Sequence, residues 1–479
     1  MKKYLLTAAA ILLILIANAQ WLNQNAGFTN DTLGFYEMSL PSKNIAWAVC
    51  YDGKAGLLST RPVLSFTRTT NGGNTWKPGQ MGNDYTLRFS NISAIDGNEA
   101  WVAMHKIGPV YGSYYGSFGK GGGVFHTTNA GQTWKHIKPG QLFNNNSVPR
   151  FVHFKNKNHG IAVGDPNGGY WEIYRTNNQG KKWKRVAQSK IPAALPNEVG
   201  WISGFAVVGN TIWFGTDSGR MYKSNDFGKT WTVKRLDSEL GAYVHEIAFL
   251  DDGLTGVAHL RNATSTFVFS TTDGGSTWTN YFQPPNWKNS RITAVPGTHA
   301  FVSTAIHGNP LYRGSAVSYD AGQTWIEIDN IANKAVCRFF DAQIGYAGGF
   351  FVTGPPLRGG IFKSEIVFQI PGCANNNKQV EITSAEKMPG MEEKPVAGDR
   401  VKAYPTPARD VINILLEEPL ANTSSVISII ALDGKVMDSR RYKASRLLQV
   451  DLSKLAPGLY VLRIESAGQT FNKTITILR

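Results

Sequence analysis

Residues 271–278 of this chain read TTDGGSTW, and this octet decides the fold because variants of it occur six times. Each copy fits the pattern Ser/Thr-x-Asp/Asn-x-Gly-x-Thr-Trp, which we call the box; in the third copy Lys182 stands in the Thr position. The six boxes end at Trp76, Trp134, Trp183, Trp231, Trp278 and Trp325. Such self-similarity is the signature of a repeat architecture.

The spacing of the boxes identifies the repeat. From the second box to the sixth, the tryptophans lie 49, 48, 47 and 47 residues apart, a period typical of one four-stranded propeller blade. The first gap, of 58 residues, needs an insertion. A second signature, a short apolar strand, recurs at Trp47, Trp101, Ile161, Trp213, Gly256, Phe301 and Tyr346. Seven such strands for six boxes predict seven blades.

The last blade lacks a box, and the N-terminus supplies a replacement. Trp21 precedes Trp47 by 26 residues, much as Trp76 precedes Trp101 by 25. We therefore expect the segment that begins at Trp21 to pair with residues 359–364 and to complete blade seven, which removes an exposed sheet edge. The predicted fold class is all-β: a seven-bladed β-propeller of four-stranded blades closed by its N-terminal strand, followed by a small C-terminal β-sandwich.

The box itself is predicted to be a structural turn. Its hydroxyl and its Asp or Asn can bond amides of the same turn, its Gly permits a positive φ, and its Trp packs between sheets. Half of its acidic positions are amides, which excludes a general acid or an obligatory calcium ligand. The structural box residues are Asn71, Trp76, Asn129, Trp134, Asn178, Trp183, Asp226, Trp231, Asp273, Trp278, Asp320 and Trp325.

The first residues predict export from the cytoplasm. Lys2 and Lys3, an apolar run and Ala17-Asn18-Ala19 form a secretory signal peptide over residues 1–19, with cleavage near Ala19. No transmembrane helix is expected after it. Only three cysteines occur, so disulfides do not hold the fold together. We expect at most one bridge, between Cys337 and Cys373, with Cys50 as a buried thiol.

The formal net charge of +15 becomes +13 without the signal peptide, of which residues 401–479 carry +4. The remaining +9 suits an anionic glycan, lipopolysaccharide or another acidic surface outside the cell better than nucleic acid. The alternative explanation is that this positive charge serves only to keep the protein soluble. We expect a propeller over residues 20–372, a polar linker over residues 373–400 and a β-sandwich over residues 401–479, where apolar residues alternate.

Two resemblances follow from these motifs. From Trp21 to Ser364, the boxes resemble the Asp-box or BNR repeats of sialidase-type propellers, and their pairing with strands such as NIAWAVCYD more closely resembles the Ycf48/HCF136-like assembly factors of photosystem II. Residues 404–407, YPTP, with the segments around Gly434 and Gly458, resemble the C-terminal sorting domain of the type IX (Por) secretion system of Bacteroidetes, although Thr406 replaces the usual Asn. This resemblance implies the type IX machinery as a partner, and removal of the tail during surface attachment or release.

Candidate ligand residues lie on the propeller face opposite the boxes. Loops that follow the second strands of blades one and two are long, and they hold Tyr51, Arg61, His105, Tyr111, Tyr114 and Tyr115. The inner strands begin with Arg88, Arg150, His245, Arg291 and Arg338. Together these cations could form an anion pocket, or each could pair with a protein carboxylate or carbonyl group.

The leading functional hypothesis is a secreted or surface-attached, non-catalytic scaffold that binds a glycan or a protein. The alternative is a sialidase-like or other glycoside hydrolase, for which paired carboxylates would be needed; Glu99, Glu172 and Glu246 have no evident partner in the sequence. We assign no catalytic residue, and expect no cofactor and no metal because the nine histidines lack ligand spacing.

Overall fold

The computed structural model describes residues 20–29, 33–52, 63–108, 118–138, 142–143, 146–236, 241–282, 284–307, 312–330, 332–349, 360–366, 368, 401–404, 411–416, 423–431, 436–445, 447–456, 458–467 and 469–477. The expected signal peptide and linker lie outside this part of the chain. The fold separates into two compact units, Met1–Asn376 and Asn377–Arg479.

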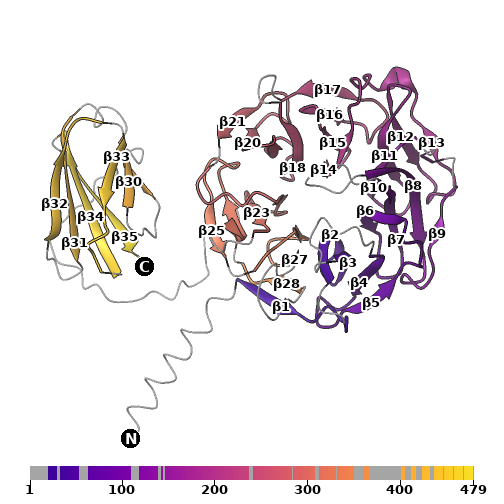
Figure 1. The fold of residues 1–479 in the computed structure, drawn as a ribbon, viewed down its shortest axis with the longest axis horizontal. Helices are drawn as coiled ribbons and strands as arrows, with labels where there is room; N and C mark the ends of the chain where they lie inside the picture. Colours follow the sequence, from indigo (N-terminus) through magenta and orange to yellow (C-terminus); the bar gives the residue numbers. More distant parts are fainter. Residues whose placement is uncertain are drawn as a thin grey trace, which may run out of the picture. The chain divides into compact units, whose positions relative to one another are not determined.

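The first unit is a β-propeller of seven four-stranded antiparallel sheets (Figure 1). Blade 1 contains β2 (Leu33–Ser42), β3 (Ile45–Asp52), β4 (Ser65–Thr69) and β5 (Lys77–Gln80). Blade 2 contains β6 (Leu87–Ala94), β7 (Ala100–Ile107), β8 (Phe118–Thr127) and β9 (Lys135–His136). Blade 3 contains β10 (Pro149–Phe154), β11 (Gly160–Asn167), β12 (Tyr170–Thr176) and β13 (Lys184–Arg185).

The remaining blades repeat this order. Blade 4 contains β14 (Gly200–Val208), β15 (Thr211–Thr216), β16 (Arg220–Ser224) and β17 (Thr232–Arg235). Blade 5 contains β18 (Tyr243–Phe249), β19 (Gly256–Arg261), β20 (Thr266–Thr271) and β21 (Thr279–Phe282). Blade 6 contains β22 (Arg291–Ala294), β23 (Phe301–Ala305), β24 (Gly314–Ser318) and β25 (Ile326–Asp329). Blade 7 contains β26 (Val336–Phe339), β27 (Gly345–Gly349), β28 (Gly360–Ser364) and β1 (Trp21–Gln24).

The N-terminal strand closes the ring, as the spacing of Trp21 predicts. Strand β1 lies beside β28 (Figure 1), and the two pair antiparallel with Trp21 opposite Ser364. The Trp21 indole N–H donates to Ser315 Oγ of blade 6 at 2.9 Å, and its ring packs with Val302 and Val317 of the same blade. Trp21 therefore binds the last blade to its neighbour, as the box tryptophans do elsewhere.

Each box is a self-bonded turn. In the first, Thr69 Oγ1 donates to Asn71 Oδ1 at 2.9 Å and accepts from the Gly73 amide at 3.0 Å, while Asn71 Oδ1 accepts from the Thr75 amide at 3.0 Å. The same bonds recur at Thr271 and Asp273 in the fifth box. The polar groups that suggest a site are thus used within the turn.

The box also joins its blade to the preceding one. Trp134 of blade 2 packs edge-on against Trp47 of blade 1, with ring centroids 6.4 Å apart, and Trp183 of blade 3 packs against Trp101 of blade 2 at 6.1 Å. The two sequence signatures, box and apolar strand, are therefore two halves of one contact between blades.

The cysteine prediction needs a correction. Cys50 is a buried free thiol in β3, as expected, and Cys337 in β26 is also a buried free thiol. Cys337 is fully enclosed in the apolar cluster that holds Trp21 and Phe339, and burial raises its pKa to about 12. The expected bridge from Cys337 is therefore not formed; Cys373 lies outside the described residues. Within the described part, no helix is long and apolar enough to cross a membrane.

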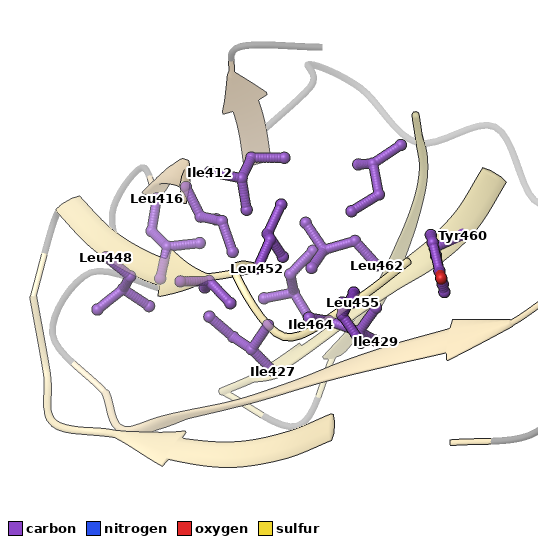
Figure 2. Packing of buried hydrophobic residues seen from close by; sticks show 13 residues of the cluster. Ile412, Leu416, Ile427, Ile429, Leu448, Leu452, Leu455, Tyr460, Leu462 and Ile464 are labelled. Atoms are coloured by element: carbon purple, nitrogen blue, oxygen red, sulfur yellow. The ribbon is translucent and has the colours of Figure 1, made fainter. Parts of the chain in front are cut away.

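The second unit is a small β-sandwich, as predicted. One sheet contains β29 (Val401–Tyr404), β30 (Val411–Leu416) and β33 (Leu447–Asp451). The other has the order β32 (Val436–Tyr442), β31 (Ser425–Ala431), β34 (Gly458–Ser466) and β35 (Gln469–Ile477). Figure 2 shows their shared core, in which Ile412 and Leu448 of the first sheet pack with Ile427 and Leu462 of the second.

Candidate functional site

The two faces of the propeller are distinguished by backbone hydrogen bonds. The box of blade 1 bonds the turn between the first and second strands of the same blade, from the Gly72 amide to Asn44 O at 2.9 Å. The equivalent bond in blade 2 runs from the Ala130 amide to Asn98 O at 2.9 Å. Boxes and these turns therefore share one face. The inner strands begin at the opposite face, which we call the entry face.

A network of ion pairs lies along the inner strands of four blades. Arg338 Nη2 of blade 7 contacts Glu37 Oε1 of blade 1 at 2.8 Å. Arg291 of blade 6 contacts Glu37 Oε2 at 3.9 Å and makes a closer pair with Glu246 of blade 5. Arg291 also donates to Tyr36 O at 3.2 Å. Two predicted ligand-binding arginines are thus brought together, but with carboxylates as their partners.

Glu246 is a member of this network whose pKa is shifted strongly by its surroundings. Burial raises its pKa to about 7, with Arg291 and Arg338 opposing the shift and Glu37 adding to it. The side chains of Glu37 and Glu246 are only 5% and 2% exposed. The two carboxylates share one guanidinium group in a nearly dry environment, where both are needed to balance two arginines.

Arg150 is also neutralised within the protein. Its Nε and Nη2 donate to the two carboxylate oxygens of Asp165 at 2.7 and 2.6 Å, and Asp165 Oδ1 also accepts from the Gly200 amide of blade 4 at 2.9 Å. This bidentate pair is buried and joins blades 3 and 4.

Arg88 and His105 stand opposite each other in β6 and β7. Arg88 is half-buried, and burial lowers its pKa. Ser90 Oγ lies 2.9 Å from His105 Nδ1 and donates to Pro149 O at 2.6 Å. Burial, with Arg150 and Arg88 nearby, lowers the pKa of His105 to about 3, so this ring is neutral. Tyr51 packs edge-on against Tyr36, with ring centroids 5.9 Å apart.

An aromatic group lies where blades 4 and 5 meet. The register of β14 shifts between Gly200 and Phe205, and the extra residues present Trp201 to the Tyr243 ring at 4.9 Å. His245 lies 5.5 Å from Trp201, and burial together with His259, Arg291 and Arg261 lowers its pKa well below the usual value. Trp201 and Tyr243 are half-exposed.

Further aromatic side chains reach solvent on the entry face. Tyr85 lies in the crossing from blade 1 to blade 2 and is 55% exposed; Tyr312, in the loop between the second and third strands of blade 6, is 59% exposed. The sequence reasoning missed Tyr85, Tyr312, Trp201 and Tyr243, although their positions in loops and inner strands on the ligand face could have indicated them.

The sequence reasoning also missed the carboxylate partners. Glu37 occupies the inner strand of blade 1, as Glu246 does in blade 5, so alignment of the repeats could have found it. Of the three glutamates considered as catalytic candidates, Glu99 lies 3.1 Å from His126 and Glu172 lies 3.7 Å from Arg185. Glu246 pairs with Arg291, and the carboxylate near it is Glu37, which also contacts Arg291.

Four candidate residues, Arg61, Tyr111, Tyr114 and Tyr115, lie outside the described residues. The glycines at residues 119–123 form the beginning of β8. Among the residues that the structure describes, no group of three or more His, Cys, Asp or Glu side chains is placed to hold a metal ion.

Comparison with known proteins gives different results for the two units. Residues 402–478 match the family of secretion system C-terminal sorting domains. Two curated relatives of the propeller are the chloroplastic photosystem II stability/assembly factors HCF136 of Oryza sativa subsp. japonica, 29% identical over 147 residues, and of Arabidopsis thaliana, 27% identical over 160 residues. The matches cover 30% and 33% of this chain, and 30% and 34% of the relatives. The chain thus spans about a third of the length of these relatives.

Among solved structures, YCF48 from Cyanidioschyzon merolae is similar with a TM-score of 0.49 and 18% identity, over 72% of this chain and 99% of that one. The sorting domain indicates that the chain is secreted through the type IX system to the cell surface or beyond.

Proposed function

We propose that this chain is an exported propeller that binds a glycan or a protein on its entry face and performs no chemistry on it, as a binding or assembly scaffold. We further propose that it is processed near Ala19 and that the sorting domain is removed during surface attachment or release. Among the predicted residues, Tyr51 and Arg88 would contact the ligand together with the exposed aromatic side chains, and the buried His105 and His245 would support them from below.

The observation that carries this proposal is that the carboxylates of Glu37 and Glu246 are buried and paired with arginine. A glycosidase needs two carboxyl groups that reach the scissile bond, one as acid and one as base or nucleophile. Glu37 and Glu246 are close to one another, but both are buried and both are held by arginine. A substrate could reach them only after the ion pairs between four blades had broken.

Binding is supported by the composition of the entry face. Tyr and Trp side chains give large contact areas at a small cost in conformational entropy, and they are typical of recognition surfaces. Trp201 and Tyr243 are presented by rigid inner strands, and Tyr85 and Tyr312 by the surrounding loops. The names of the curated relatives, stability and assembly factors, agree with a scaffold role.

A glycoside hydrolase is the second candidate. One observation favours it: burial raises the pKa of Glu246 to about 7 near a second carboxylate, Glu37, and a raised pKa is a property of the general acid in glycosidases. The scaffold hypothesis and the hydrolase hypothesis predict different results for the same variant, Glu246→Gln.

The test uses the full mature chain on an array of glycans and in hydrolysis assays with the same glycans. The scaffold model predicts saturable binding, no released sugar, and unchanged binding by Glu246→Gln where the variant folds. Trp201→Ala and Tyr243→Ala should each weaken binding at least tenfold, whereas Phe340→Ala, which removes an exposed aromatic side chain on the box face, should not. Release of sugar by the wild type, abolished in Glu246→Gln, would favour the hydrolase.

A further inference from the structure

The positive charge of the propeller is concentrated in two blades. Residues 149–236, which form blades 3 and 4, contain fourteen Lys or Arg and five Asp or Glu, a net charge of +9. Residues 20–148 carry ten and six, or +4, and residues 237–372 carry eight and eleven, or −3. General solubility does not require such an asymmetry, because a mixed surface serves it equally well.

Seven of the ten exposed cations of these two blades lie on the outer strands and the boxes; the others are Lys155, Lys157 and Lys190. We call this surface the basic wall, and define it by Lys181, Lys182, Lys184, Lys229, Lys234 and Arg235, all of which are exposed. Lys181 and Lys182 belong to the third box and Lys229 to the fourth; the other three lie in β13 and β17. Arg185 is left out of the definition because it lies 3.7 Å from Glu172.

The wall is continuous from one blade to the next. Arg175 in β12 stands opposite Lys184 in β13, and its Nε donates to Phe227 O at 2.6 Å, inside the fourth box. The same box carries Lys229, and β17 follows it directly. The outer strand of blade 3 is thereby fixed beside the cations of blade 4.

The described carboxylates of these blades are engaged away from the lysines of the wall. Three are buried and paired elsewhere: Asp165 with Arg150, Glu172 with Arg185, and Glu198 with Arg220 at 3.1 Å. Asp226 accepts hydrogen bonds within its own box, and Asp217 accepts from the Val199 amide at 3.0 Å. None of the described carboxylates between residues 149 and 236 is fully exposed.

Protection of sheet edges explains only part of this pattern. Lysine on an outer strand discourages pairing with another sheet, but the outer strands of blades 5 and 6 read TNYF and IEID and contain no lysine. The lysines of the two boxes are not on an edge. The concentration of cations therefore indicates a partner.

We propose that the basic wall binds an anionic polysaccharide. Lysine ammonium groups act as flexible point charges that suit the repeated carboxylate, sulfate or phosphate groups of such a polymer. Single-stranded nucleic acid is less suited, because base stacking needs exposed aromatic rings and the outer strands and boxes of blades 3 and 4, where the wall lies, expose none. The wall lies away from the entry face, so this inference goes beyond the ligand site proposed above.

The experiment measures binding of the full chain to polygalacturonate, with neutral dextran and double-stranded DNA as the other probes. The wild type should bind polygalacturonate with an affinity that falls steeply as salt rises, and should not bind dextran. A wall variant with Lys181, Lys182, Lys184 and Lys229 changed to Gln should lose at least tenfold in affinity. The matched control changes Lys43, Lys77, Lys106 and Lys120 to Gln and removes the same charge; it should lose less than threefold.

Three outcomes would overturn the proposal. Equal losses in the two variants would mean that only net charge matters, tighter binding of DNA than of polygalacturonate at equal charge would indicate a nucleic acid, and binding of dextran would exclude a charge-based site. Tyr243→Ala separates this wall from the entry face, because it should keep full binding to polygalacturonate whether or not it affects the entry-face ligand.

Discussion

Aspartate and asparagine are interchangeable in the box because a threonine hydroxyl can reverse its role. Thr277 Oγ1 donates to Asp273 Oδ2 at 2.6 Å, whereas in the first box Asn71 Nδ2 donates to Thr75 Oγ1 at 2.9 Å. A hydroxyl is both donor and acceptor, so the turn is satisfied with either side chain. This is the chemistry of a structural turn, in which charge is not required.

The first prediction follows from that reversal. Asp273→Asn should change the free energy of unfolding by less than about 0.5 kcal/mol, since every hydrogen bond of the turn can be remade. Asp273→Ala should cost roughly 1–2 kcal/mol, because the Thr277 amide and two hydroxyls lose their partner. Urea unfolding of the three proteins measures both values. Equal losses in the two variants would mean that the negative charge itself stabilises the turn.

A buried histidine gives a second prediction at the same scale. His259 is fully buried in β19, neither ring nitrogen finds a hydrogen-bond partner among the described residues, and its pKa falls to about 3 through burial, assisted by Arg261. In the unfolded chain the His259 imidazole is protonated below about pH 6.5, whereas in the folded chain it stays neutral down to about pH 3. The free energy of unfolding therefore falls as the pH drops from about 6.5 toward 3.

His259→Leu should remove this contribution. Relative to wild type, the variant should gain roughly 1.4 kcal/mol of stability for each pH unit below 6.5, and should be neutral or slightly stabilised at pH 8, where an unsatisfied polar ring is exchanged for an apolar side chain. The measurement is the free energy of unfolding between pH 4.5 and 8. Leu260→Val, a buried substitution without a titrating group, should shift the curve without changing its slope. A parallel curve for His259→Leu would refute the assignment.

At the scale of the element, the repeat is held together by contacts between a box and the strand of the blade before it. Trp213 Nε1 of blade 4 donates to Gly274 O in the box of blade 5 at 3.1 Å. The sequence predicts these contacts because box and apolar strand each have a local pattern, and the period of the repeat fixes how often they meet. The same local patterns predict the ring closure by Trp21.

Glycine at the fifth position of the box permits a positive φ and leaves room for a ring of the preceding blade. Gly180 in the third box and Gly168, which lies outside the boxes between β11 and β12, allow the two effects to be separated. Gly180 has φ +70° and lies against the Trp101 ring of the preceding blade, where a Cβ would overlap the ring. Gly168 has φ +68° but has nothing within 4 Å of such a Cβ. Gly168→Ala should cost about 1 kcal/mol from backbone strain alone, whereas Gly180→Ala should cost about 3 kcal/mol or more because it also forces the two blades apart. Thermal unfolding of the two variants would contradict this if the losses were equal.

At the scale of the whole molecule, prediction from sequence succeeds for the ring and fails for its charges. The seven blades and the sandwich follow from periodic patterns. The carboxylate partners of the arginines on the inner strands, however, lie far away in sequence, as with Glu37 and Arg338, which are 301 residues apart. A single sequence shows that arginines begin the inner strands; only the closed ring shows that glutamates of other blades meet them.

The ion pairs of Glu37 also join the first blade to the last two. Their contribution to the free energy of unfolding can be measured. Glu37 is bound by Arg338 of blade 7 and Arg291 of blade 6, so Glu37→Gln should leave poorly compensated buried cations and cost about 3–5 kcal/mol. Arg338→Met should cost less than this, since Arg291 still balances Glu37. The double variant should be more stable than the sum of the single losses predicts, by at least about 1.5 kcal/mol, because removal of both charges leaves fewer unpaired groups.

The same cycle on Asp438 and Arg440, an exposed pair of the sandwich at 3.0 Å with side chains 27% and 48% exposed, serves as the control. Solvent screening should reduce its coupling to less than about 1 kcal/mol. Additive losses at Glu37 and Arg338 would mean that the network does not stabilise the ring. The buried carboxylates would then lack the structural role that argues against catalysis, and the hydrolase hypothesis would gain by the same measurement.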